Sequence, residues 1–133
     1  MSFTKKNLEN KNGIFFSNIT DSETKKVTEF YKITPFPNYK ENDDKKTISE
    51  KGDKNLLAKQ FKKFIGYEKN VLEVGCGTGQ LSIYFGIGSN NRIVAMDPTI
   101  YSLNLAKNFV DKNNLKNINF LNADIFDDVL SND

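Results

Sequence analysis

The residues best suited to chemistry gather at three points in the second half of the chain. The first is a glycine-rich segment, Glu73-Val-Gly-Cys-Gly-Thr-Gly79, which carries one carboxylate and one thiol. The other two are single carboxylates, Asp97 and Asp124, each of which follows a short apolar run. Carboxylates accept hydrogen bonds from hydroxyl and amino groups, and glycines let the backbone turn tightly and approach a ligand closely. The three points predict a binding site for a ligand with hydroxyl groups and positive charge.

Several kinds of catalytic centre are excluded by composition. The 133 residues contain no His, which removes Ser–His and Cys–His pairs and histidine zinc sites. Cys76 is the single cysteine, so no internal disulfide forms, and without a His to activate it we expect a small packed residue. Asp127 and Asp128 are adjacent acids after a strand, which are usually solvated. We therefore predict no metal site and name no catalytic residue.

The spacing of apolar residues predicts the elements that must position these groups. Helical spacing predicts three helices, and short apolar runs between them predict three strands, over 71–74, 92–97 and 118–121. Strands that alternate with helices imply parallel pairing with right-handed crossovers. Ligands of such sheets bind outside the carboxyl ends of the strands. The glycine-rich segment, Asp97 and Asp124 are therefore predicted to face one site.

The first 54 residues predict an irregular and partly helical N-terminal arm. Gly13–Phe16 can form a short strand, and a helix is expected from Asp21 or Ser22 to just before Pro35. The Pro35–Tyr39 segment is a rigid aromatic turn that either covers the ligand site or packs the arm on the sheet. Residues 40–54 are densely charged and predict a solvated loop. We place the domain boundary here, with the arm over 1–54 and an α/β domain over 55–133.

Three stretches of the sequence resemble the motifs of the class I S-adenosylmethionine-dependent methyltransferases. Val71-Leu-Glu-Val-Gly-Cys-Gly-Thr-Gly-Gln80 is similar to the first motif of that family, and Ile93-Val-Ala-Met-Asp97-Pro98 to the second. Phe120-Leu-Asn-Ala-Asp124-Ile125 is similar to the third. The resemblance covers roughly residues 55 to 128, with the motifs in the family's order and spacing. It implies a Rossmann-like parallel sheet in the order 3-2-1 with flanking helices.

The resemblance also implies a role for each site residue. Glu73 and the backbone of the turn, listed as Gly75, Cys76, Gly77 and Gly79, would hold the methionine part of S-adenosylmethionine. Asp97 would bind the ribose. Pro98, Asp124 and Ile125 would surround the adenine. Tyr39 is a candidate for contact with an unknown methyl acceptor, and the acceptor itself is not predicted.

Two other functions compete with methyl transfer. An NAD-binding domain needs the spacing G-x-G-x-x-G, but Gln80 stands where its last glycine belongs, and the Glu73 carboxylate would repel a pyrophosphate. A non-catalytic nucleoside-binding module, or a remnant of an enzyme, would keep the same three motifs without turnover. Binding of S-adenosylmethionine separates the first competitor from our prediction, and methyl transfer separates the second.

The resemblance further implies that only the cofactor-binding half of the fold is present. The family has seven strands, and three are visible before residue 133, so we expect a fragment or one part of a split enzyme, inactive alone. The strand over 71–74 would then end the sheet and could pair with a complementing chain or a second copy. The net charge of +2 gives no strong signal for nucleic acid. No apolar run is long enough to span a membrane, and a single cysteine fits the cytoplasm.

Overall fold

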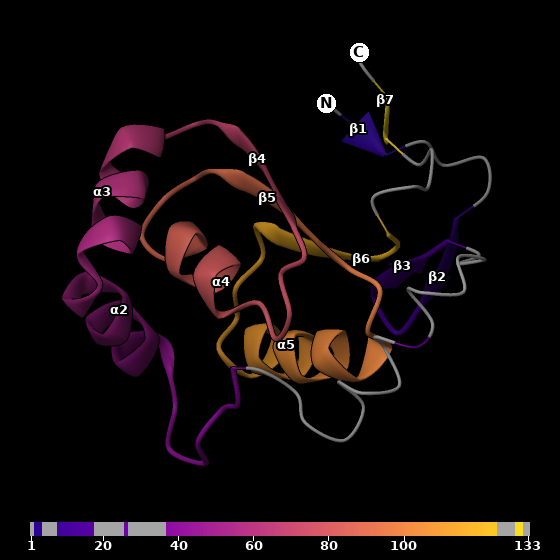
Figure 1. Cartoon of the computed structure of the whole chain (residues 1–133), viewed down its shortest axis with the longest axis horizontal. Coiled ribbons are helices and arrows are strands. Elements are labelled where there is room, and N and C mark those ends of the chain that lie inside the picture. The colour runs from indigo at the N-terminus through magenta and orange to yellow at the C-terminus, as the bar shows by residue number, and fades with distance from the viewer. Residues whose placement is uncertain (1, 4–7, 18–25, 27–36, 125–129, 132–133) are drawn as a thin grey trace.

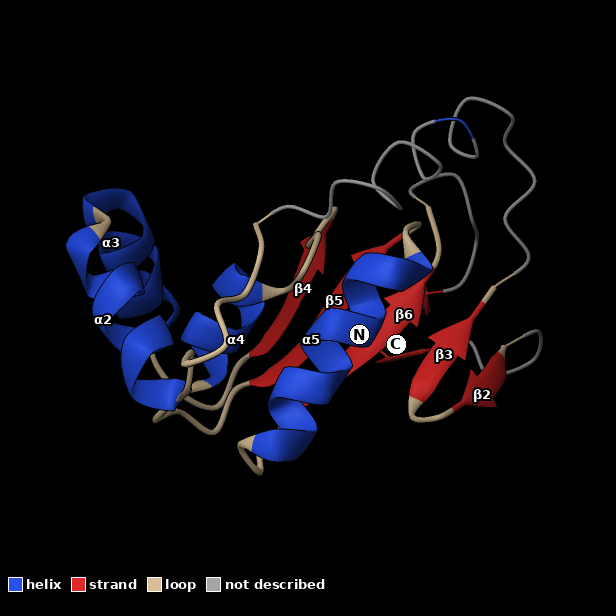
Figure 2. Cartoon of the chain, turned by 90° about the horizontal axis from the view of Figure 1, so that it is seen from below, coloured by secondary structure: helices blue, strands red, loops and turns tan. Residues whose placement is uncertain are grey.

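The computed structural model describes residues 2–3, 8–17, 26, 37–124 and 130–131. Its centre is a five-stranded sheet in the order β2-β3-β6-β5-β4. Figures 1 and 2 show α4 (Gln80–Gly86) and α5 (Ile100–Lys112) side by side on one face of this sheet. The helices α2 (Lys45–Lys54) and α3 (Leu56–Ile65) lie beyond β4 (Figure 2). The α/β class predicted from the sequence is confirmed.

Three parallel strands form the part of the sheet that the sequence predicted. They are β4 (Asn70–Val74), β5 (Arg92–Asp97) and β6 (Ile118–Asn122), and β5 lies between the other two. The predicted order 3-2-1 is therefore correct for these strands. The register sets Val74 beside Met96 and Asp97 beside Asn122, so the carboxyl ends of β4, β5 and β6 meet at one edge.

The N-terminal arm adds two strands that the predicted order did not contain. β3 (Ile14–Phe16) confirms the short strand expected near Gly13 and pairs parallel to β6, with Ile14 buried. β2 (Glu9–Lys11) precedes β3 and pairs with it antiparallel. The two strands are joined by a turn at Asn12 and Gly13, both of which have positive φ. Asn-Gly is the pair that two-residue hairpin turns favour. A separate ribbon pairs β1 (Ser2–Phe3) with β7 (Leu130–Ser131).

The solvated loop predicted for residues 40–54 is wrong, because most of this segment forms α2. Asp44 caps the helix: its carboxylate accepts from the Thr47 backbone N–H at 2.9 Å, and its own N–H donates to the Thr47 hydroxyl at 2.7 Å. Such a capping box stabilises a helix start without any apolar signal. Ile48 supplies the single buried side chain of α2. The helix expected between Asp21 and Pro35 lies outside the described residues except for Lys26, which has helical backbone.

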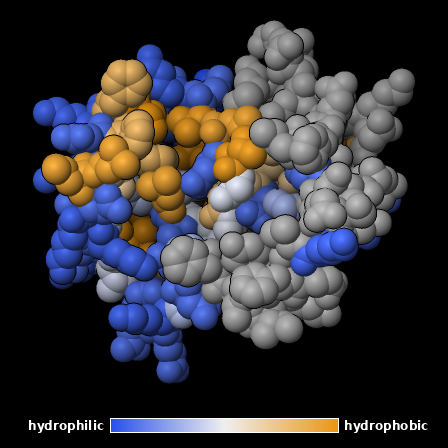
Figure 3. Space-filling model, viewed as in Figure 1, coloured by the Kyte–Doolittle hydropathy of each residue, from blue (hydrophilic) through white to orange (hydrophobic). Residues whose placement is uncertain are grey.

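The two edges of the sheet differ in how well they resist further pairing. β2 is three residues long and carries Glu9 and Lys11, and both short length and charge discourage edge pairing. β4 ends the other side, as predicted for the strand over 71–74, and has five residues without Lys or Pro. Figure 3 shows apolar side chains gathered on this side of the molecule. Among the described residues, exposed apolar side chains of α3 include Leu57, Phe61 and Phe64, with exposed fractions of 62%, 50% and 88%.

The helices of the described part do not include a membrane span, since none is both long and apolar enough to cross a bilayer.

Candidate functional site

The glycine-rich segment makes a tight turn between β4 and α4. The N–H groups of Gly75 and Cys76 both donate to the Met96 carbonyl of β5, at 2.8 and 3.0 Å. The Gly79 N–H donates to the carbonyl of Cys76 at 2.9 Å. Gly75, Gly77 and Gly79 all have positive φ, of 73°, 58° and 78°. Residues with a side chain rarely adopt this conformation, which explains why every second residue of the turn is Gly.

Asp97 joins the end of β5 to this turn. One carboxylate oxygen accepts from the Gly77 N–H and the other from the Thr99 N–H, each at 2.8 Å. The side chain is buried, with 8% exposed. Each carboxylate oxygen can accept a further hydrogen bond. The structure therefore brings together two of the three points that the sequence singled out, and it leaves Asp97 with acceptor capacity for a ligand.

Glu73 provides a second carboxylate near the turn. It lies on β4, partly buried, and accepts a hydrogen bond from the Ser82 hydroxyl of α4 at 2.5 Å. Burial raises the pKa of Glu73, the Ser82 hydrogen bond opposes that rise, and the charge of Asp97 adds to it. Sequence reasoning missed Ser82, because nothing in a helix pattern shows which residue will face a strand carboxylate.

Cys76 is held as an unreactive thiol. Its side chain is buried, with 6% exposed. Burial raises the pKa of the thiol, and the nearby carboxylates of Asp97 and Glu73 raise it further. A thiol under these conditions does not ionise near neutral pH. Cys76 therefore packs in the turn as a neutral thiol.

Asp124 lies just past β6, at the same edge of the sheet as the turn. The side chain is buried, with 6% exposed. The neighbouring residues tie β6 to β5, since the Asn122 side-chain amide and the Ala123 N–H both donate to the Asp97 carbonyl, at 3.1 and 3.3 Å. Pro98 is partly exposed between Asp97 and Thr99. Ile125 lies outside the described residues.

The end of the aromatic turn, residues 37–39, packs directly on the glycine turn. The Tyr39 hydroxyl donates to the Thr78 carbonyl at 2.6 Å, and the Thr78 hydroxyl donates to the Pro37 carbonyl. The Gln80 side-chain amide donates to the Asn38 carbonyl at 3.1 Å. We call these three hydrogen bonds the clasp. The sequence left open whether this segment covers the ligand site or packs the arm on the sheet. The contacts favour packing of the arm, and they are made with the backbone of the glycine turn.

The turn is open on one side and closed on the other. A β-carbon added at Gly75 would meet no atom of the described residues within 4 Å, so they leave space beside this residue. At Gly79 the added carbon would come within 3.0 Å of Ala106 and 3.4 Å of Phe120, so the helix must pack closely there. A ligand can therefore approach the turn at Gly75, next to Glu73.

The site offers acceptors more readily than donors. The N–H groups of Gly75, Cys76, Gly77 and Gly79 already donate within the chain, whereas two carboxylates stand beside the turn. A pyrophosphate needs free N–H groups at a helix start, as dinucleotide-binding turns provide. A ligand with a positive group and hydroxyls suits this arrangement better. Among the described residues, no group of three or more acids or cysteines is arranged to hold a metal ion.

Comparison with known proteins points to one family. A family model described as "Methyltransferase domain" matches residues 65–133. Over 61 residues the chain is 41% identical to a protein of Methanocaldococcus jannaschii named as a protein N5-glutamine methyltransferase; the match covers 46% of this chain and 30% of that protein.

Two solved structures share part of the architecture. A chain of Methanococcus maripaludis, titled as an S-adenosyl-L-methionine-dependent methyltransferase, has a TM-score of 0.49 at 20% identity, covering 69% of this chain and 47% of that one. An S-adenosylmethionine-dependent methyltransferase of Aquifex aeolicus has a TM-score of 0.45 at 27% identity, covering 62% and 48%. This chain spans well under two thirds of the length of each of these relatives.

Proposed function

Because this chain belongs to the methyltransferase-domain family, we propose that it binds S-adenosylmethionine and forms the cofactor-binding part of a methyltransferase. The observation that carries the proposal is the contact between the Asp97 carboxylate and the Gly77 N–H, which joins two of the strand-end motifs in one site. The resemblance drawn from the sequence motifs agrees with the family match.

The residues at the strand ends fit the chemistry of this cofactor. Glu73 lies beside the open face of the turn, where its carboxylate would attract the amino group and the sulfonium of the methionine part. Asp97 would accept hydrogen bonds from the two ribose hydroxyls with its remaining lone pairs. Asp124 would accept from the exocyclic amine of adenine, with Pro98 and Ile125 beside the ring.

Bound S-adenosylmethionine supplies a methyl group on a positively charged sulfur, for transfer in line to a nucleophile. The contribution of this chain is to hold and orient that group, because alignment supplies most of the catalysis in such displacements. The clasp and the Asp97 contacts hold the backbone of the turn in place.

The test is calorimetric titration of the folded chain with S-adenosylmethionine, S-adenosylhomocysteine and NAD. We expect binding of both sulfur ligands and none of NAD. Absence of heat with both sulfur ligands, in a sample whose circular dichroism shows a folded protein, would contradict the proposal. Binding without methyl transfer to any of a panel of acceptors would favour the alternative of a non-catalytic module. For location we propose the cytoplasm, supported by the single, buried cysteine.

A further inference from the structure

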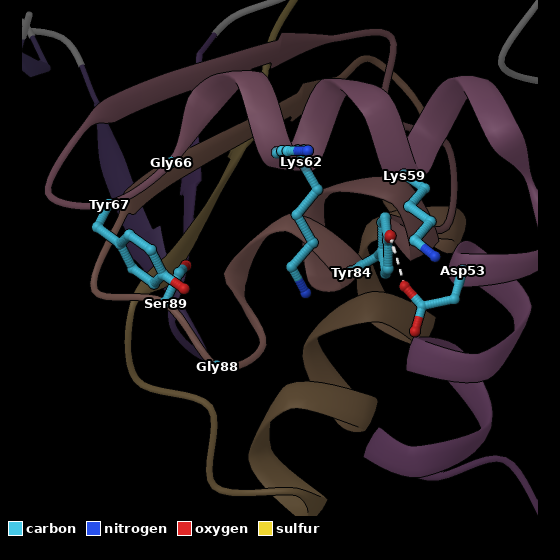
Figure 4. Close-up of a pocket in the computed structure, with 9 residues that line it drawn as sticks. Asp53, Lys59, Lys62, Gly66, Tyr67, Tyr84, Gly88 and Ser89 are labelled. Carbon is cyan, nitrogen blue, oxygen red and sulfur yellow. Dashed lines mark hydrogen bonds between the residues drawn. The ribbon is translucent and has the colours of Figure 1, made fainter.

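A pocket lies at the opposite end of α4 from the glycine turn. Its volume is about 350 Å³, and it is formed by α3, the end of α4 and the loop that follows. The side chains that matter here are those of Lys59, Lys62, Lys63, Tyr67, Tyr84 and Ser89. Figure 4 shows Tyr67 and Ser89 at one end, Lys59 and Tyr84 at the other, and Lys62 between them. We call this the α3–α4 pocket.

Among the described residues that line this pocket, lysines outnumber acids by three to one. Within the described residues, no carboxylate lies within 4.0 Å of the ammonium group of Lys59, Lys62 or Lys63. Asp53 is the one acid in the lining, and its carboxylate accepts the Tyr84 hydroxyl hydrogen bond at 2.9 Å. Three ammonium groups around one cavity repel one another, and an anion between them relieves that repulsion.

Lys62 is held in place at the centre of the pocket. Its ammonium group donates to the Ile87 carbonyl at 2.9 Å and lies 4.4 Å from the centre of the Tyr84 ring. Burial lowers the pKa of Lys62, and the charge of Asp53 opposes that shift. Since the ammonium group has three donors, two remain after the contact with Ile87. A fixed and partly desolvated cation of this kind binds an anion more strongly than a freely moving surface lysine.

The shape of the pocket selects among anions. Lys59 and Lys63 are one helical turn apart, so their charges line the same wall, which suits a chain of phosphates. The volume is far larger than a single inorganic phosphate requires and falls in the range of small-ligand sites. Tyr67, 70% exposed at the other end, offers an aromatic face on which a base can stack.

We propose that the α3–α4 pocket binds a nucleotide, with its phosphates among Lys59, Lys62 and Lys63 and its base against Tyr67. The pocket is separate from the strand-end site, because Gly79 caps the start of α4 whereas Ser89 follows its end. A helix of seven residues is about 10 Å long. The proposal does not rest on methyltransferase activity.

The test is calorimetric titration of the full chain with uridine diphosphate, and separately with pyrophosphate, at low ionic strength. A uridine nucleotide is chosen so that an adenosine site at the strand ends cannot account for the heat. We expect uridine diphosphate to bind, and the double variant Lys59→Met, Lys63→Met to bind about tenfold more weakly, as for the loss of one or two charge-assisted hydrogen bonds. The matched control is Lys45→Met, Lys46→Met on the exposed side of α2, which should bind as the parent does.

Two further arms separate the parts of the proposal. Tyr67→Ala should weaken binding of uridine diphosphate and leave pyrophosphate binding unchanged, because only the base reaches the ring. Titration with an oligouridylate distinguishes RNA from a free nucleotide as the natural ligand. If the oligouridylate binds more tightly than uridine diphosphate, with a steeper dependence on salt concentration, the ligand is RNA. If it binds equally or more weakly, the ligand is a free nucleotide. Absence of binding of both diphosphate probes, or equal losses in the pocket and control double variants, would overturn the proposal.

Discussion

The hydroxyl group of Tyr39 donates a hydrogen bond to the backbone carbonyl of Thr78 at 2.6 Å, across 39 positions of sequence. The ring of Tyr39 also stacks on Phe109 of α5, with ring centres 4.9 Å apart. Tyr39 thus connects the N-terminal arm, the glycine turn and α5. In the structure, Tyr39 supports the backbone of the glycine turn. The contact with a methyl acceptor that the sequence suggested for this side chain stays a prediction.

The variant Tyr39→Phe isolates this support, because it removes the hydroxyl and keeps the ring stack. We expect a loss of about 1 kcal/mol in the free energy of unfolding, typical of one hydrogen bond, and several-fold weaker binding of S-adenosylhomocysteine. Thermal denaturation and calorimetry measure the two effects. Lys116→Ala, at an exposed position between α5 and β6, is the control for both. Unchanged ligand affinity in Tyr39→Phe would mean that the turn keeps its shape without the Tyr39 hydrogen bond.

Removal of the Asp97 carboxylate should have the largest effect on nucleoside binding. Asp97→Ala loses the acceptors for Gly77 and Thr99 as well as those proposed for the ribose, so we expect binding of S-adenosylhomocysteine to fall at least about a hundredfold. Asp111→Ala, on the exposed side of α5 and paired with Lys107, is the matched control. Near-normal affinity in Asp97→Ala, with circular dichroism unchanged, would remove Asp97 from the site.

Glu73 should make stability and ligand binding respond to pH in opposite directions. Because its pKa in the folded chain is raised above the ordinary value of 4.5, the folded state holds this proton more tightly than the unfolded state. Stability therefore falls as the pH rises from that value through the raised pKa. Glu73→Gln should lack this contribution to the pH dependence of stability, and at neutral pH it should be more stable than the parent protein.

The affinity for S-adenosylmethionine depends on the negative charge of Glu73, so it should increase with pH, whereas the stability decreases. Binding of S-adenosylmethionine should weaken as the pH falls through the raised pKa of Glu73, and Glu73→Gln should bind weakly throughout. Urea unfolding and calorimetry across the acid range measure both quantities. The difference between the two proteins isolates Glu73 from the other carboxylates. Equal pH dependence in parent and variant would show that Glu73 does not carry the effect.

The apolar face of α3 should be open to solvent in the isolated chain. Phe64 is 88% exposed, so Phe64→Ser should change the free energy of unfolding by less than about 0.5 kcal/mol and reduce binding of a hydrophobic dye. Phe120→Ala provides the contrast, since Phe120 is fully buried and its truncation should cost about 3–5 kcal/mol. A large loss of stability in Phe64→Ser would indicate that this face is packed, for example in a self-associated state detectable by sedimentation.

The central β-α-β-α-β unit could be predicted from sequence because each of its elements is encoded locally. Apolar runs mark β4, β5 and β6, and the alternate glycines mark the turn. α2 was missed because its stability comes from the capping box of Asp44 and one buried residue, Ile48, in a segment that otherwise has the composition of a loop. The position of β3 beside β6 depends on pairing across about a hundred residues, which local periodicity cannot encode.

The candidate functional site, like the fold, could be predicted from the sequence only in part. The carboxylates and glycines could be named from sequence because parallel strands bring their carboxyl ends together. The partners of those groups could not be named. Ser82 meets Glu73 only because α4 lies over β4, and the clasp depends on where the N-terminal arm returns to the sheet. The expectation that a complementing chain or second copy covers the edge at β4 stays a prediction.

The two edges of the sheet differ, so a further strand can pair more readily with β4 than with β2. Parallel pairing engages alternate residues of β4 with β5, as the bonds from Arg92 to Lys69 and from Gly75 to Met96 indicate. The backbone groups of Asn70, Leu72 and Val74 therefore point outward, while short, charged β2 discourages addition on its own side. A further strand would therefore pair with β4 rather than with β2. The end of that strand would lie beside the glycine turn and not beside Asp124.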